Sequence, residues 1–404
     1  MGGRIGRPAH RVAGFRNDPI PLGDHCAHGH LPGGGTLFQI GLPKGSDVFN
    51  ALQQQRRSSI TAPVIWALMD LWAARLLPPW MQALGRLGKL LWIVDLNRQS
   101  LDRVVPGIRS SRTYVLDTKP DPRQPQVVRA IEAEELAAKA GYSRPHTIHC
   151  GPGGIFLFSL GGANGNDGPG GVALLDHDTF DVIGPWEADR GDQYFAYDGW
   201  WHLNHDTVIT SEWATPSMIE NGLNPEDLLG RKFGHHLNFW SMSDRKLTQR
   251  IDLGDAHQMV FEVRPAHDPE KAWGFVGVVI SVEDLSGSVW LWHRDGDRWA
   301  ARKVITIPAE PADPELLPPA LKPFGAVPPL VSDIDLSVDD RWLYVSCWGT
   351  GELKQYDVSD IFHPTETGSV RLGGIVGRQP HPAAPDQPLA GGPQMVEVSR
   401  DGRR

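Results

Sequence analysis

Five histidines stand in short segments that could supply metal ligands. His146 and His149 occur in PHTIHC, His235 and His236 in FGHHLNFW, and His267 in VRPAHDP. Neutral imidazole nitrogen is a ligand that copper prefers, and His149, His236 and His267 would leave one position open for a thiolate or O2. In an extended strand a spacing of three residues puts two side chains on opposite faces, so we expect only one of His146 and His149 to face a shared site. The alternative is that these histidines only bond backbone groups in turns.

A thiol and a carboxylate are the candidate catalytic residues. Cys150 directly follows His149, and a cationic histidine or a metal beside it would lower the pKa of the thiol and populate the thiolate. The alternative is a small buried residue, which we expect for Cys347 inside LYVSCW. Glu212, in TSEWATP, stands where an unpaired carboxylate would be costly. It is therefore either bonded to the backbone or placed in a functional cavity.

Three aspartates allow the same two interpretations. Asp198 lies in YDGWW, and Asp333 and Asp335 lie in SDIDLS. Asp333 and Asp335 would share one face of a strand, where a coupled acid and base would need an unusual environment. We therefore expect this pair to stabilise turns.

The composition sets the class of protein in which these residues act. The chain has 404 residues, of which 40% are hydrophobic and 22% charged, as in ordinary globular proteins. A formal net charge of −9 argues against a broad phosphate-binding surface, so we predict that the protein binds no nucleic acid. The first residues lack the apolar core of a secretory signal, and the most apolar stretch, 60–77, is interrupted by charges. We expect no membrane span and a cytoplasmic location, with a periplasmic one open if the true N-terminus differs.

Turn-forming residues and repeated strand pairs predict an all-β fold. The chain contains 45 glycines and 34 prolines, which leaves little room for long helices. A hairpin around a polar turn recurs five times, and another strand lies between successive hairpins, so each repeat supplies about four strands. Radial stacking of such sheets predicts a β-propeller, whose inward loops could bring distant histidines together. The equivalent positions of the five hairpins are Leu116, Leu175, Trp240, Trp292 and Tyr356.

Both ends of the chain depart from this repeat. Residues 1–105 show helical spacing in places and none of the repeat's turns, so we expect an atypical, partly helical N-terminal segment followed by the propeller over 106–404. Residues 395–404, MVEVSRDGRR, reproduce a strand and an Asp-Gly turn and then stop. This pattern predicts a ring that is truncated at its C-terminal end.

From Pro106 to Arg404 the chain resembles one known family almost continuously. The resemblance is carried by PGIRSSRTYVLDTKPDPRQP, RPHTIHC, GGVALLDHDTFDVIGPWE, YDGWWHLNHDTVITSEWATPSMIENG, GFVGVVIS, SDIDLSVDDRWLYVSCWGTGELKQYDVSD and AGGPQM, in this order. These segments resemble the selenium-binding protein family, which includes the methanethiol oxidases. The resemblance implies a β-propeller, seven-bladed in the family and incomplete here.

The resemblance also implies an activity and its partners. Methanethiol oxidases convert methanethiol, O2 and water to formaldehyde, hydrogen sulfide and hydrogen peroxide, in bacteria with copper. The implied partners are thus a small thiol and O2, with copper as the cofactor and selenium as a second bound element. We favour His149 as a ligand because HTIHC matches the family's own segment. The family's segment His-His-x-Gly-Trp-Asn-x-Cys-Ser-Ser is absent, and the nearest fragment is LGDHCAHGH at 22–30. A non-catalytic selenium-binding protein and a propeller interaction scaffold stay open as alternatives.

Overall fold

Four antiparallel sheets of four strands each make up most of the described chain. The computed structural model describes residues 110–117, 124, 126–163, 167–220, 222–389, 391–399 and 401–402, so the expected N-terminal segment 1–105 lies outside the described residues. Consecutive strands pair within each sheet. The sheets comprise β3 (Tyr142–Gly151), β4 (Gly154–Gly162), β5 (Gly171–Leu175) and β6 (Val182–Pro185); β7 (Gly199–His202), β8 (Thr207–Ser211), β9 (His236–Ser241) and β10 (Lys246–Asp252); β11 (His257–Pro265), β12 (Trp273–Ser281), β13 (Gly287–Asp295) and β14 (Arg298–Ile307); and β17 (Val331–Leu336), β18 (Trp342–Cys347), β19 (Glu352–Asp357) and β20 (Thr365–Arg371).

Smaller elements precede, connect and follow these sheets. In the described part of the chain, no helix has the length and apolar character needed to cross a membrane. The smaller elements are the strand pairs β1 (Thr113–Asp117) with β2 (Gln126–Ile131), β15 (Glu310–Pro311) with β16 (Ala326–Val327), and β21 (Pro380–His381) with β22 (Ala384–Pro388), and the helices α4 (Ala133–Ala140), α5 (Pro216–Ile219) and α6 (Pro225–Leu229).

The predicted hairpins are confirmed, and they occupy the outer edges of the sheets. The five hairpins of the sequence repeat correspond to β1–β2, β5–β6, β9–β10, β13–β14 and β19–β20. The second strand of each complete sheet is the additional strand that the sequence places between hairpins. The fold is therefore the predicted all-β propeller, with the four-stranded sheets as its blades.

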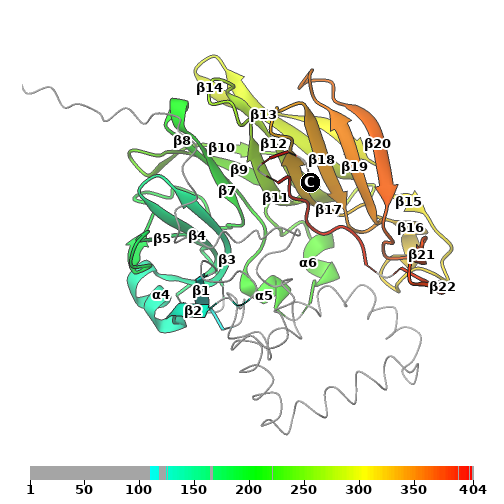
Figure 1. Ribbon diagram of the computed structural model, residues 1–404, viewed down its shortest axis with the longest axis horizontal. Helices are drawn as coiled ribbons and strands as arrows, with labels where there is room; N and C mark the ends of the chain where they lie inside the picture. Colours follow the sequence, from blue (N-terminus) through cyan, green and yellow to red (C-terminus); the bar gives the residue numbers. More distant parts are fainter. Residues whose placement is uncertain are drawn as a thin grey trace, which may run out of the picture.

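The first strand of each blade lies on the inside of the propeller. Figure 1 shows the four blades side by side in chain order, with β3, β7, β11 and β17 on their inner side. Strand β11 packs against β7 on one side and against β17 on the other. Residues from β7, β11 and β17 therefore meet although they are far apart in the sequence.

Apolar side chains fill the space between neighbouring blades. Trp292, Phe239 and Val276 are fully buried in the layer between the blades of β7–β10 and β11–β14. An equivalent layer with Phe275 and Leu343 joins the blade of β11–β14 to that of β17–β20. These layers hold the inner strands in fixed relative positions, because close-packed side chains allow little sliding.

The strand predicted at the C-terminal end does not form a regular ladder. Residues 391–399 run beside β17 (Figure 1), but the backbone N–H groups of Val396 and Val398 donate to the carboxylates of Asp333 and Asp335 at 2.6 and 2.7 Å. The predicted turn is present, since Gly402 N donates to Ser399 O at 2.7 Å. The N–H groups of Val396 and Val398 thus donate to side-chain carboxylates instead of to backbone carbonyls of a neighbouring strand.

Candidate functional site at the inner strands

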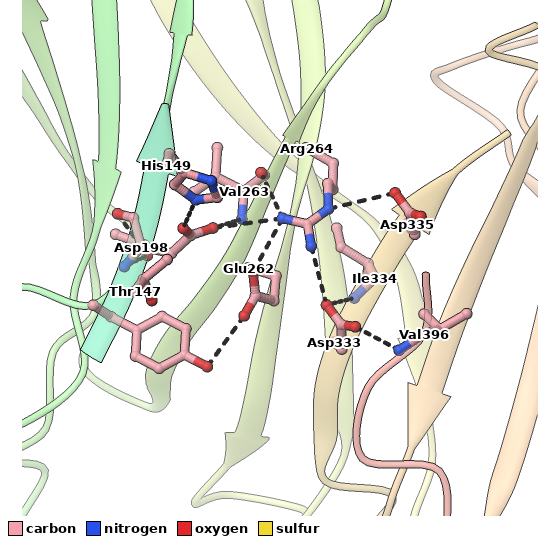
Figure 2. Close-up of polar contacts among 12 residues, drawn as sticks. Thr147, His149, Asp198, Glu262, Val263, Arg264, Asp333, Ile334, Asp335 and Val396 are labelled. Carbon is pink, nitrogen blue, oxygen red and sulfur yellow. Dashed lines mark hydrogen bonds and ion pairs between the residues drawn. The ribbon is translucent and has the colours of Figure 1, made fainter. Parts of the chain in front are cut away.

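Six ionisable side chains from different blades meet at the inner strands (Figure 2). We call this group the axial cluster. All six residues are buried, although charged side chains are almost never fully buried unless they are paired. The members of the axial cluster are His149 on β3, Asp198 just before β7, Glu262 and Arg264 on β11, and Asp333 and Asp335 on β17.

Arg264 is the centre of the axial cluster. Its Nη1 donates to Glu262 Oε2 at 3.0 Å and lies 3.6 Å from Asp198 Oδ2. On the other side, its Nη2 and Nε lie 3.5 and 3.4 Å from Oδ1 of Asp333 and of Asp335, respectively. One guanidinium therefore joins the blades of β7, β11 and β17, which suits its fixed fork of donors.

The expectation that Asp333 and Asp335 only stabilise turns is wrong. Both lie within β17, and the Oδ1 of each accepts the next backbone N–H, from Ile334 and Leu336, at 2.9 Å. Their other oxygens accept N–H groups of the C-terminal segment. The two carboxylates point to the same side because residues two apart in a strand share a face, and there Arg264 supplies the compensating charge.

Burial and the excess of carboxylates perturb the ionisation of the axial cluster. Burial raises the pKa of Asp333 to about 8 and that of Glu262 well above its ordinary value, against the opposing effect of Arg264. The pKa of Asp198 is lowered, because His149, Arg264 and the N–H of Val263 favour its ionised form over the cost of burial. Four carboxyl groups thus share one guanidinium, and Asp333 favours its protonated form at neutral pH.

His149 is oriented by Asp198 and enclosed by aromatic rings. Its Nε2 lies 2.8 Å from Asp198 Oδ1, and the other oxygen of Asp198 accepts the Val263 N–H at 3.0 Å. The indole of Trp200 meets the imidazole edge to face, with ring centroids 4.5 Å apart, and stacks on Trp201. Histidines that bind metals usually have their other ring nitrogen held by a carboxylate or a carbonyl oxygen, as the ring of His149 is held by Asp198.

A β-bulge in β3 overturns the argument that His146 and His149 face opposite ways. Pro145 pairs with Ser159 but Ile148 pairs with Leu157, so β3 contains one extra residue between them. The extra residue shifts the alternation of side chains, and His146 and His149 therefore lie on the same face. A three-residue spacing separates faces only in a regular strand.

His146 lies close to this site in an aromatic environment. Its ring centroid is 4.7 Å from that of Tyr197, whose hydroxyl donates to Glu262 Oε1 at 3.2 Å. Burial lowers the pKa of His146 to about 4, so that its ring is neutral at pH 7. Neutral imidazole is the form that binds transition metals, and the donors of this face, His146 and His149 with Asp198 behind, fit copper in chemical type.

The two cysteines within the described residues, Cys150 and Cys347, lie away from this face. Cys150 follows His149 in β3, and its side chain packs with Ile148 against the apolar cluster that contains Leu157 and Ala173. It therefore projects to the side opposite to His149, as expected from strand alternation. Cys347 is fully buried, and its burial raises the pKa of the thiol to about 12, which confirms it as a core residue.

Glu212 and His236 belong to a different polar group, on the blade of β7–β10. The fully buried carboxylate of Glu212 lies 3.1 Å from His236 Nδ1, accepts from Asn238 at 3.1 Å and pairs with Arg250 at 3.0 Å. Side chains therefore satisfy this carboxylate. The sequence had suggested backbone hydrogen bonds or a functional cavity, and side-chain partners were not expected. His235 lies beside His236, with ring centroids 4.2 Å apart.

His267 lies at the end of β11 and joins two blades. Its Nδ1 lies 2.8 Å from Asp340 Oδ1, which also accepts the backbone N–H of His267. The half-exposed ring has a raised pKa because of this hydrogen bond. Thus His149, His236 and His267 have three different carboxylate partners. In the described part of the chain, these three histidines do not form a group with one another whose ligand atoms lie within 4.8 Å; of the three, only His236 belongs to such a group, with His235 and Asp252.

Sequence reasoning missed Glu262 and Arg264. They lie two residues apart in the apolar strand HQMVFEVRP, and opposite charges on one face of a buried strand were the available signal. The partners of Arg264 come from β17 and from the residue just before β7, so the sequence alone did not identify the ion pairs.

Comparisons with known proteins place the chain in a family. Residues 94–404 match the family described as 56 kDa selenium-binding protein (SBP56). The chain is 37% identical to a methanethiol oxidase of Xenopus laevis over 318 residues, which are 74% of this chain and 65% of that protein. It is 36% identical to the human methanethiol oxidase over 326 residues, 77% of this chain and 66% of that protein.

A solved structure agrees with these matches. The X-ray structure of a hypothetical selenium-binding protein from Sulfolobus tokodaii superposes with a TM-score of 0.70 and 52% identity, covering 74% of this chain and 64% of that one. The chain thus spans about two thirds of the length of these relatives. From the family match and these relatives, the chain belongs to the selenium-binding protein family.

Proposed function

We propose that the protein is a copper-assisted, methanethiol oxidase-like oxidoreductase. The reaction would take methanethiol, O2 and water to formaldehyde, hydrogen sulfide and hydrogen peroxide, one molecule of each. The proposal is supported by relatives named methanethiol oxidase and by one observation in this chain, the buried His149–Asp198 pair enclosed by Trp200 and Trp201. This pair offers an oriented imidazole in a setting that excludes water.

In this proposal His149 and His146 would hold the copper. When bound, copper would supply the one-electron chemistry that the reaction of a thiol with O2 requires. Asp198 would orient the ring of His149, and the indoles of Trp200 and Trp201 would keep water from a one-carbon thiol. The protonated carboxyl groups of the axial cluster, Asp333 foremost, would offer exchangeable protons. Cys150 and Glu212 would take no direct part, because both face elsewhere.

The test uses the full chain, purified, loaded with copper and given methanethiol under air. Hydrogen sulfide and hydrogen peroxide should appear in equal amounts. His149→Gln should lose copper and both products. Asp198→Asn should bind copper about tenfold to a hundredfold more weakly, as expected when the carboxylate that orients a ligating histidine is lost. The control is His363→Gln, which changes an exposed histidine paired with Asp360. Full copper binding by His149→Gln would exclude His149 as a ligand.

A second candidate function is selenium binding without turnover, which the description of the family favours. Stoichiometric uptake of selenium by the purified chain, with no sulfide or peroxide from methanethiol, would support it against the oxidase. Under either function we propose a cytoplasmic location and no nucleic-acid or membrane partner. Fractionation of cells that express the tagged chain tests the location.

A further inference from the structure

We propose that His235, His236 and Asp252 bind a divalent transition metal at a site separate from the axial cluster. Each residue offers one ligand atom, and the three atoms lie within 4.8 Å of one another. It is the only group of three or more such side chains that meets this criterion among the residues described by the structure. The residues border the antiparallel pair of β9 and β10.

The backbone fixes the three residues relative to one another. His236 and Asp252 are direct partners in the register of β9 and β10, and Leu253 N donates to His235 O at 2.9 Å. Gly234 permits this arrangement, because a Cβ at that position would lie 2.4 Å from Glu212 Cβ. The segment can therefore approach Glu212 closely only with glycine at position 234.

Hydrogen bonds at the opposite nitrogens direct both Nε2 atoms toward Asp252. His235 Nδ1 lies 3.1 Å from Phe233 O, an acceptor, and His236 Nδ1 lies 3.1 Å from the carboxylate of Glu212. Both contacts require the proton on Nδ1, which leaves the lone pair of each neutral ring on Nε2. Arg250 also lies 3.1 Å from His236 Nδ1, but it donates to both oxygens of Glu212 and does not need the ring as an acceptor.

The distances suit a shared metal better than direct hydrogen bonds. The Nε2 atoms of His235 and His236 lie 3.7 and 4.0 Å from Asp252 Oδ1, which is beyond hydrogen-bond length. Two ligand atoms at about 2.1 Å from a tetrahedral metal lie about 3.4 Å apart. Small side-chain rotations would therefore bring the three atoms to a common ion. Asp252 is already held, since its Oδ1 accepts the Gly254 N–H at 2.8 Å.

Charge and exposure also favour a cation at this position. The negative charge of buried Glu212 is compensated by Arg250, so the carboxylate of Asp252 adds a net negative charge to the site. The side chain of Asp252 is 60% exposed and those of the two histidines 21% and 15%, which gives an ion access from solvent. Two imidazoles and one carboxylate suit zinc and similar divalent ions, with water completing the coordination. The metal would link β10 to the end of the segment that carries α5 and α6.

The test compares binding of Zn2+ and Co2+ by the full chain and its variants after treatment with a chelator. The proposed copper ligands His146 and His149 would also bind these ions, so the measured quantity is the difference from the wild type. His235→Gln and Asp252→Asn should each lose one equivalent of Co2+, together with its visible d–d absorption, or bind it at least tenfold more weakly. Asp252 is exposed and His235 is partly exposed, so both variants should fold. The control variant His363→Gln removes an exposed histidine of another His–Asp pair and should retain full binding.

A second readout is thermal stability, because a metal that binds only the folded state raises Tm. Zn2+ should raise the Tm of the wild type more than that of Asp252→Asn. It should raise the Tm of His149→Gln as much as that of the wild type, relative to Asp252→Asn. This outcome would distinguish the site from the proposed copper centre. Equal metal binding by the wild type, His235→Gln and Asp252→Asn would overturn the proposal, as would absence of binding in the wild type.

Discussion

Replacing Arg264 with methionine should destabilise the protein strongly and in a pH-dependent way. The substitution keeps much of the length of the side chain but removes the only guanidinium within the axial cluster. Four buried carboxyl groups would lose their shared cation: Asp198, Glu262, Asp333 and Asp335. Removing one partner of a buried ion pair typically costs about 3–5 kcal/mol, and we expect a loss of this size at pH 8.

The pH dependence follows from the carboxyl pKa values. Burial already raises the pKa of Asp333 to about 8, while Arg264 opposes this shift. A carboxyl whose folded pKa exceeds its unfolded value stabilises the protein below the unfolded pKa, and this stability is lost as pH rises to the folded pKa. Without Arg264 these pKa values rise further. If the folded variant keeps one more proton than the folded wild type between pH 5 and pH 7, its free energy of unfolding falls by about 3 kcal/mol more than that of the wild type over this range.

The assay is urea unfolding of the wild type and Arg264→Met at pH 5, 7 and 8, followed by tryptophan fluorescence and circular dichroism. The matched control is Arg298→Met, on the outermost strand β14, where the side chain is exposed and a change within about 0.5 kcal/mol is expected. The reasoning would be refuted if Arg264→Met lost less than about 1 kcal/mol at pH 8, or the same amount at every pH.

Two other substitutions test contacts between blades. Asp340→Asn removes the carboxylate that holds His267 and Lys271. Hydrogen bonds from His267 lower the pKa of Asp340 to about 2, so the free energy of unfolding of the wild type should fall by about 2 kcal/mol as pH falls from 4 to 2. Acid unfolding of the variant should lack this decrease. Trp292→Ala removes a fully buried indole that packs against Trp299 and donates to Phe275 O at 3.2 Å. Urea unfolding should therefore show a free energy of unfolding about 3–5 kcal/mol lower than that of the wild type. The control is Trp342→Ala, which should cost less because Trp342 is partly exposed. A wild-type acid profile in Asp340→Asn, or equal losses for the two tryptophans, would contradict these assignments.

Local patterns in the sequence were sufficient to predict the blades. A hairpin depends on residues close in the chain: alternation of apolar and polar side chains, and a turn between them. The five repeated hairpins and the propeller were therefore predictable. The role of Cys347 as a core residue was predictable for the same reason, since Leu343, Val345 and Cys347 alternate along one buried face of the strand.

The chemistry at the inner strands depended on details beyond the pattern. One extra residue in β3 places His146 and His149 on the same face, and no residue type in PHTIHC signals that bulge. The spacing rule failed there because it assumes a regular ladder. Likewise, Asp333 and Asp335 were predicted to stabilise turns because two carboxyl groups on one strand face would need an unusual environment. Arg264, from the neighbouring strand β11, supplies that environment.

The sequence by itself determined the family, the strand repeat and the residue types available for chemistry, because each depends on order along the chain. Only the tertiary structure decided which charges meet. Arg264 reaches carboxylates on either side of β11, and the three histidines expected to share one metal are each held by a different carboxylate. The physical reason is that buried charges must find partners in space, and the packing of blades, rather than sequence separation, sets which partners lie within reach.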